Sequence, residues 1–134
     1  MRVLVCGGRD YRRQVEVYWQ LDKINRDHGV SAVITGGATG ADEFGFYWGS
    51  KHTPVDNLQF KADWAKYGRK AGPIRNQRML DEGRPDVVLA FPGGHGTEDM
   101  VRRAEAAGIK IIRVTDGHTE AASRNCGRKE RTNG

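Results

Sequence analysis

Short apolar runs alternate along the chain with segments in which apolar residues recur every three or four positions. The runs have the length of β-strands, and the glycines or polar residues that follow them mark where each strand ends. The predicted strands cover residues 3–6, 31–35, 55–60, 87–91 and 111–114. Most of these runs lack polar alternation, which is typical of strands covered on both faces of a parallel sheet. The run at 55–60 is an exception, because Asp56, Asn57 and Gln59 interrupt it.

The segments between the runs predict helices. Two of them end before Gly29 and Gly108, and in both the apolar residues recur at helical spacing. A third helix is predicted to begin near Thr39, because Thr39 and Asp42 have the spacing of an N-cap and N3 pair. A fourth is predicted over residues 73–82, with a proline in its first turn.

The alternation of strands and helices predicts the α/β class. We expect a Rossmann-like three-layer sandwich with a five-stranded, mostly parallel sheet and right-handed crossover connections. The predicted domain covers residues 1–116. Residues 117–134 show no apolar periodicity, so we expect them to form a polar, disordered tail.

A length of 134 residues and a mass of 14.9 kDa fit one domain. The longest apolar run has five residues, far short of the ~20 that cross a bilayer. The apolar stretch at the N-terminus is shorter than that of a signal peptide. We therefore expect a cytoplasmic protein without a membrane partner.

The charge balance changes this picture little. Lys and Arg number 22 and Asp and Glu 17, which gives a formal net charge of +5. Residues 117–134 contribute +2 of it, with four basic and two acidic residues. Such an excess suits an anionic partner and is equally ordinary for a soluble domain. Cys6 and Cys126 lack the spacing of metal ligands, so we predict no metal-binding residues, although a metal ion accompanying bound phosphates stays open.

Three glycine-rich turns follow predicted strands, at residues 7–10, 36–42 and 92–97. Ligands of open α/β sheets bind beyond the carboxyl ends of the strands. Glycine lets the backbone approach such a ligand, and the N–H groups that open the next helix attract phosphate. The turn residues expected to bind ligand or phosphate are Gly7, Gly8, Arg9, Asp10, Gly36, Gly37, Thr39, Gly40, Asp42, Pro92, Gly93, Gly94, Gly96 and Thr97.

The turn at 92–97 reads Pro-Gly-Gly-His-Gly-Thr and resembles the Pro-Gly-Gly-x-Gly-Thr signature of the SLOG superfamily, which includes the LOG-type phosphoribohydrolases and DprA. Together with the other two turns, Ala62-Asp63-Trp64 and the segment at 72–76, it is similar to the YspA/YpsA-like branch. The resemblance covers residues 1–114. It implies a Rossmann-like fold and a nucleotide-derived ligand, such as an ADP-ribose or NAD derivative or a nucleoside monophosphate. It also implies a possible homodimer, and no further cofactor is expected.

The candidate catalytic residues are three carboxylates. LOG-type hydrolases carry a glutamate three residues after the Thr of the signature, and Met100 stands at that position here. Glu98 and Asp99 are the nearest replacements, although acidic residues in a first helical turn also stabilise the helix. Asp42 is consistent with binding of a ribose hydroxyl, with a catalytic base, or with a capping box.

The sequence leaves two possible roles open for each of several further candidate ligand-binding residues. Arg75 and Asn76 open a predicted helix, where Arg75 either takes a phosphate or is an exposed cation. Arg9 and Asp10 either bind ligand or pair with each other. Trp64 either stacks on a base or covers the edge of the sheet. His95 is similarly either a phosphate or proton contact or a surface residue of its turn.

Three functions follow in order of preference. The first is binding, for sensing or processing, of a nucleotide-derived small molecule across the three turns. The second is hydrolysis or transfer at an N-glycosidic bond of a nucleotide, with Asp42, Glu98 or Asp99 as the carboxylate. The third is single-stranded nucleic-acid binding, which requires exposed basic and aromatic residues beside one groove. It ranks last because the excess of positive charge is modest, so we do not expect nucleic acid as a partner.

Overall fold

The computed structural model describes residues 1–115 and 118–119. Five parallel strands and one short antiparallel strand form a sheet in the order β3-β2-β1-β4-β5-β6. The strands are β1 (Arg2–Cys6), β2 (Ala32–Thr35), β3 (Asp56–Gln59), β4 (Val87–Ala90), β5 (Lys110–Thr115) and β6 (His118–Thr119). The predicted Rossmann-like sheet of five parallel strands is thus confirmed, with β6 added at the edge beside β5.

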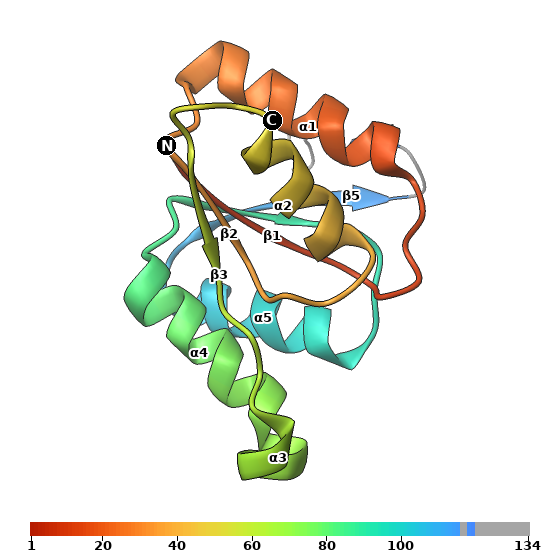
Figure 1. Ribbon diagram of the computed structural model, residues 1–134, viewed down its shortest axis with the longest axis vertical. Coiled ribbons are helices and arrows are strands. Elements are labelled where there is room, and N and C mark those ends of the chain that lie inside the picture. Colours follow the sequence, from red (N-terminus) through yellow and green to blue (C-terminus); the bar gives the residue numbers. More distant parts are fainter. Residues whose placement is uncertain (116–117, 120–134) are drawn as a thin grey trace.

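Helices cover both faces of this sheet. They are α1 (Gln14–His28), α2 (Ala41–Ser50), α3 (Trp64–Tyr67), the 3-10 turn η1 (Gly68–Lys70), α4 (Ala71–Gly83) and α5 (His95–Ala106). Figure 1 shows α1 and α2 on one face and α4 and α5 on the other, so the predicted three-layer sandwich is confirmed. The short α3 projects from one end of the molecule.

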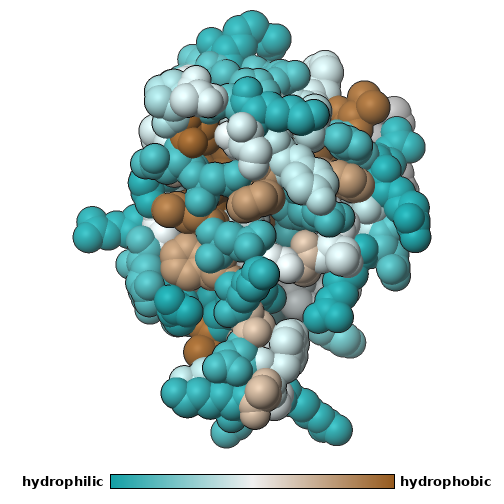
Figure 2. All heavy atoms as spheres, viewed as in Figure 1, coloured by the Kyte–Doolittle hydropathy of each residue, from teal (hydrophilic) through white to brown (hydrophobic). Residues whose placement is uncertain are grey.

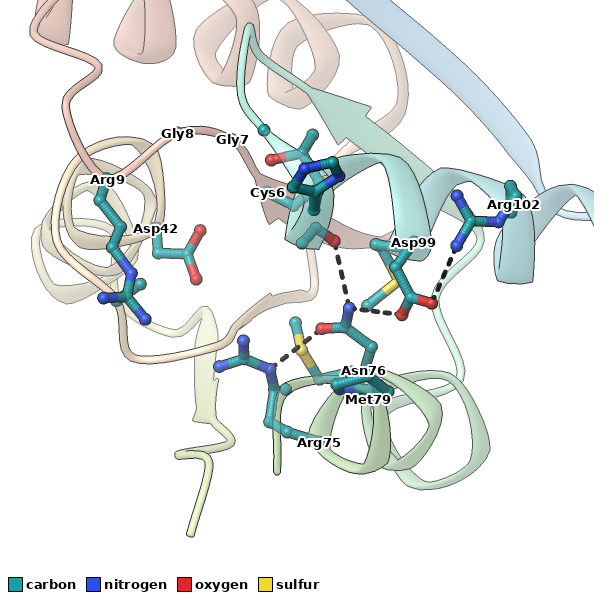
Figure 3. Close-up of a pocket in the computed structure, with 18 of the residues that line it drawn as sticks. Cys6, Gly7, Gly8, Arg9, Asp42, Arg75, Asn76, Met79, Asp99 and Arg102 are labelled. Atoms are coloured by element: carbon teal, nitrogen blue, oxygen red, sulfur yellow. Dashed lines mark hydrogen bonds and ion pairs between the residues drawn. The ribbon is translucent and has the colours of Figure 1, made fainter. Parts of the chain in front are cut away.

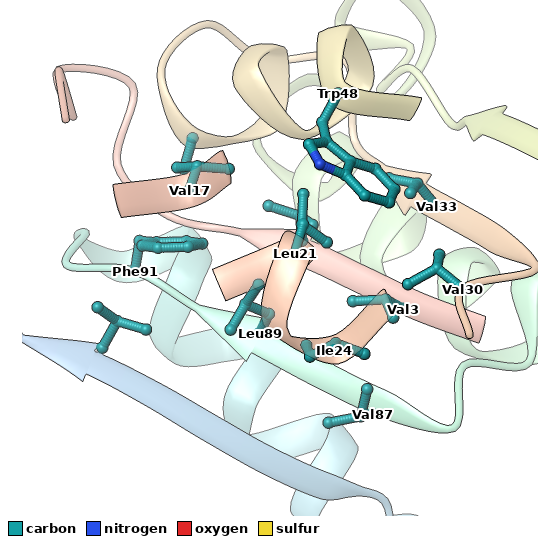
Figure 4. Close-up of a cluster of buried hydrophobic side chains, with 13 residues drawn as sticks. Val3, Val17, Leu21, Ile24, Val30, Val33, Trp48, Val87, Leu89 and Phe91 are labelled. Atoms are coloured by element: carbon teal, nitrogen blue, oxygen red, sulfur yellow. The ribbon is translucent and has the colours of Figure 1, made fainter. Parts of the chain in front are cut away.

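The core has two halves because successive residues of a strand point to opposite faces. Val3 and Val5 of β1 pack in the cluster that contains α1 and α2 residues, whereas Leu4 and Cys6 pack in the cluster that contains α4 and α5 residues. Figure 4 shows the first cluster, in which Trp48 of α2 lies over the sheet. The central strands β1, β2 and β4 are apolar at nearly all successive positions because both of their faces are buried.

The edge position of β3 explains the polar residues in the predicted run at 55–60. Asp56 and Gln59 are exposed, and Asn57 and Leu58 are half-buried. One side of β3 pairs with β2, and the other carries no described strand. A strand in this position tolerates polar side chains that a central strand would exclude.

Two helix starts differ from the prediction. The expected Thr39 cap is wrong: α2 has Gly40 at its N-cap position, and the Thr39 hydroxyl donates instead to the carbonyl of Arg9 at 3.1 Å. A tertiary contact therefore replaces the local one. Helix α4 starts at Ala71, two residues before the predicted start, and its first turn still contains Pro73. Helix α3 was not predicted.

The surface seen in Figure 2 is mostly hydrophilic, with hydrophobic residues in separate small patches. Within the described residues, no helix combines the length and the apolar character needed to cross a membrane. The predicted tail from residue 117 lies outside the described residues, apart from β6, and so does Cys126.

The packing of α1 gives a stability prediction. Leu21 is fully buried between α1 and the sheet, whereas Val15 of the same helix is 83% exposed. We expect Leu21→Ala to lower the free energy of unfolding by about 2–5 kcal/mol, because it removes buried methyl groups and leaves a cavity. Val15→Ala is the matched control and should change it by less than about 0.5 kcal/mol. Chemical denaturation measures both, and equal effects would contradict the assigned core.

Candidate functional site

A cavity lies where the strand order reverses. The chain proceeds from β1 outward to β3, then returns to place β4 on the other side of β1. The chain leaves β1 toward one face of the sheet and β4 toward the other, and open α/β sheets bind ligands at such a switch point, beyond the carboxyl ends of the strands. This cavity has a volume of about 560 Å³. Its walls come from the loops after β1, β2 and β4, from the start of α2, from α3 and η1, and from α4 and α5.

The glycine turns pack directly on one another beside the cavity. The Gly8 N–H donates to the carbonyl of Pro92 at 2.8 Å, which joins the loops after β1 and β4. A Cβ at Gly7 would lie 2.6 Å from the Cβ of Ala41. Gly40 has φ +77°, and a Cβ there would collide with the Gly8 carbonyl oxygen. These glycines are thus required by the close contact of the loops.

Gly94 and Gly96 differ from the other turn glycines. A Cβ at either position would meet nothing within 4 Å, and both residues line the cavity. Gly94 is the N-cap residue of α5, with φ −100°, and no side chain caps the helix there. The N–H groups of the first turn of α5 therefore face space that a ligand could fill.

Asp42, which is buried, and Arg75, which is half-buried, lie on one wall of the cavity (Figure 3). The Asp42 carboxylate accepts the Gly36 N–H at 3.0 Å. Arg75 donates one N–H to the Gly36 carbonyl and, through Nε, another to the Asn76 side-chain oxygen at 3.0 Å. Burial raises the pKa of Asp42 to about 6, although Arg75 and the backbone N–H groups of Gly36 and Ala38 oppose the rise.

Asn76 connects this group to α5. It is buried, and its amide donates to the Gly96 carbonyl at 3.2 Å and to the Asp99 carboxylate at 3.0 Å. Asp99 also pairs with Arg103 at 2.8 Å and with Arg102 at 3.3 Å. Burial would raise the pKa of Asp99, but the hydrogen bonds from Arg103 and Asn76 outweigh it and hold that pKa below its usual value. The second carboxylate of the cavity is therefore ionised.

The structure brings eleven of the predicted site residues to the cavity wall. They are Gly7, Gly8, Arg9, Asp42, Trp64, Arg75, Asn76, Gly94, Gly96, Thr97 and Asp99. Eight predicted residues do not line it, and these are Asp10, Gly36, Gly37, Thr39, Gly40, Pro92, Gly93 and Glu98.

Glu98 is the clearest departure among the candidate catalytic residues. Its carboxylate binds both terminal nitrogens of Arg113, at 2.8 and 3.1 Å. One step along a helix rotates a side chain by about 100°, so Glu98 points away from the wall that Asp99 forms. Of the two roles left open for Arg75, the exposed cation is wrong, because Arg75 is half-buried and donates to Gly36 and Asn76. Within the described residues, Arg9 and Asp10 make no ion pair with each other.

Several wall residues were missing from the predicted site. They are Cys6, Ala38, Arg69, Gly72, Pro73, Met79, Met100 and Arg102. His95, for which the sequence left two roles open, also lines the wall. Arg102 could have been found, because it lies three residues after Asp99 on the same helix face. Arg69 belongs to a segment without apolar periodicity, so no sequence signal indicated it.

The cavity walls offer no metal-binding cluster. In the part of the chain that the structure describes, no three His, Cys, Asp or Glu residues lie together as metal ligands. Cys6 carries a free, buried thiol. Burial raises the pKa of this thiol well above its usual value, and nearby Asp42 adds to the effect, so the thiol stays protonated at neutral pH.

The buried Asp42 gives a pH prediction. Its pKa is about 6 in the folded chain against 3.8 ordinarily, so the folded state binds the proton more tightly. The stabilisation from this group is complete below pH 3.8 and lost as the pH rises through 6. We expect Asp42→Asn to remove this loss, so that the variant gains up to roughly 3 kcal/mol relative to the parent chain between pH 4 and 7. Denaturant unfolding at several pH values measures the difference, and a constant difference would contradict the assignment.

Comparison with known proteins identifies the family of this chain. The model of the YspA, cpYpsA-related SLOG family matches residues 1–67, from β1 through α3. The chain is similar to the Gene 61 protein of Mycobacterium phage D29, with 38% identity over 122 residues that cover 86% of this chain and 97% of the phage protein. No solved structure matches the chain. The chain therefore belongs to the YspA, cpYpsA-related SLOG family.

Proposed function

We propose that this protein binds a nucleotide-derived small molecule, such as a nucleoside monophosphate or an ADP-ribose or NAD derivative, in the cavity at the carboxyl ends of β1, β2 and β4. The observation that carries the proposal is the uncapped N-terminus of α5, which opens onto the cavity beside Gly94 and Gly96. Its N–H groups and the positive end of the helix dipole favour a phosphate.

The charges of the walls support the same ligand class. Four arginines and two aspartates line the cavity, an excess of positive charge. Arg75 is held by Gly36 and Asn76, and Arg102 is paired with Asp99, so the exposed Arg9 is the cation that meets an incoming phosphate. Arginine suits this role because its fork binds two phosphate oxygens at once.

The remaining walls suit a ribose and a base. Asp42 lines the cavity, where its carboxyl would bind a ribose hydroxyl, and the half-exposed Trp64 offers a ring face to a base. A volume of about 560 Å³ is in the range of small-molecule sites. Membership of the SLOG family supports a nucleotide-related binding or processing role.

Filling the space in front of α5 tests the proposal. Gly94→Leu and Gly96→Leu place side chains where the backbone leaves room, so both should keep the fold and weaken ligand binding by about tenfold or more. The protein is incubated with AMP, ATP, NAD and ADP-ribose, ultrafiltered, and the retained ligand is identified by liquid chromatography with mass detection. Titration calorimetry with the retained ligand then gives the affinities.

The control is Ala106→Leu, an exposed substitution at the far end of the same helix. It should leave binding unchanged. Circular dichroism reports whether each variant is folded. Unchanged affinity in folded Gly94→Leu and Gly96→Leu proteins would refute this site.

A second candidate function is hydrolysis of an N-glycosidic bond, which the raised pKa of Asp42 favours. The protonated carboxyl would give its proton to the leaving base as the bond from C1′ to nitrogen breaks. The bonding electrons leave with the base, water forms the new bond to C1′, and a proton of that water returns to Asp42. The ionised Asp99 would stabilise positive charge on the ribose.

The same incubations test this chemistry. If the protein is a hydrolase, free base and ribose phosphate appear together, and Asp42→Asn should slow their release by about 100-fold or more while the nucleotide is still retained. Asp10→Asn, at a carboxylate outside the cavity wall, is the control and should have no effect. Retention of an intact nucleotide without release of base would leave binding alone as the function.

A further inference from the structure

A basic and aromatic projection borders the mouth of the cavity. It consists of residues 61–70, which we call the 61–70 arm, and it contains α3 and η1. Neither of these elements has a buried residue. The arm forms the projecting end of the molecule in Figure 1, and that end is mostly hydrophilic in Figure 2. Its charged residues are Lys61, Lys66, Arg69 and Lys70 against Asp63 alone.

The arm exposes two aromatic rings beside these cations. Trp64 is 49% exposed and Tyr67 is 40% exposed. They are three residues apart on α3, so they lie on neighbouring parts of one helix face. Lys66 places its ammonium 5.1 Å from the centre of the Tyr67 ring, and Arg9 places its guanidinium 5.8 Å from that of Trp64. The rings are thus available together with positive charge.

The arm is continuous with the cavity. Trp64 and Arg69 belong both to the arm and to the cavity wall. The ring of Trp64 lies close to Gly72 at the start of α4, where an added Cβ would be 3.4 Å from it. The single acidic residue, Asp63, accepts the Lys66 N–H at 3.1 Å and so caps α3. Its charge is directed at the helix end, and in the described part of the chain no ion pair holds the cations of the arm.

A single nucleotide cannot use all of these groups. Its phosphate at α5 and its base at Trp64 would leave Tyr67, Lys66 and Lys70 without a role. Alternating rings and cations fit a chain in which bases and phosphates alternate, and stacking on exposed rings requires bases that are not already paired. A duplex keeps its bases stacked inside the helix, so it would not reach these rings.

We propose that the 61–70 arm binds a single-stranded nucleic acid whose terminal nucleotide occupies the cavity. This inference rests on the proposed function, because it assigns to the same cavity the end of a strand as its ligand. Trp64 stacks on the terminal base, Tyr67 on the next, and Lys66, Arg69 and Lys70 neutralise the following phosphates.

Fluorescence anisotropy with the full chain tests the arm. The probes are fluorescein-labelled oligothymidylate and oligouridylate of about 12 nucleotides, which distinguish DNA from RNA. Tyr67→Ala should weaken binding by about 5- to 100-fold. Lys66→Ala combined with Lys70→Ala should lower the slope of log affinity against log salt by about 0.7 for each phosphate that the variant no longer neutralises.

The matched control is the pair Trp19 and Lys23 on α1. Trp19 is 52% exposed and Lys23 lies 5.6 Å from its ring, so the pair has the same chemistry away from the cavity wall. Trp19→Ala and Lys23→Ala should leave oligonucleotide binding unchanged. If these control variants weaken oligonucleotide binding as much as the arm variants do, the oligonucleotide attaches by charge anywhere on the surface, and the proposal is overturned.

Retention of AMP separates this proposal from the proposed function. Tyr67→Ala should keep AMP binding while it weakens oligonucleotide binding. If AMP is retained but the oligonucleotides bind no more tightly than AMP, the arm proposal is overturned and the cavity function stands. If neither AMP nor any other mononucleotide competes with a bound oligonucleotide, the strand end does not occupy the cavity, and this proposal fails.

Discussion

Direct contact between the backbones of three loops determines the shape of the cavity. Gly8 is at the centre of this contact, because its N–H donates to Pro92 and its carbonyl accepts from Tyr11 and Ala41. The turn at Gly40 comes close enough that even a methyl group would collide with Gly8. Since these loops fill the space between β1, β2 and β4, the cavity opens on the side of α4 and α5, where Gly94 and Gly96 leave room.

A buried polar network complements this backbone contact. Through Arg75 and Asn76, it links the loop after β2 to the start of α5, so three parts of the chain hold the same wall. Asp99 is held ionised by its arginine and amide partners, while burial brings the pKa of Asp42 near neutrality. One cavity thus contains two carboxyl groups with opposite protonation preferences, although both are aspartates.

The sequence predicted the sheet, its three glycine turns and eleven of the twenty residues in the cavity wall, because strands and turns depend on local patterns. It could not predict the engagement of Arg75, since Gly36 is far from it along the chain. The spacing of Thr39 and Asp42 favoured a local cap, and contacts with Arg9 and Gly36 replaced it. Helix α3 has no buried face, so no apolar periodicity indicated it.

Because α3 and η1 contain no buried residues, selection for ligand binding acts there separately from selection for folding. Substitutions there leave the hydrophobic clusters on both faces of the sheet intact, so they carry little cost in folding. Residues at the mouth of the cavity can therefore diverge between relatives while the sheet and its loops are retained. In this fold, the ligand preference can change with little change in stability.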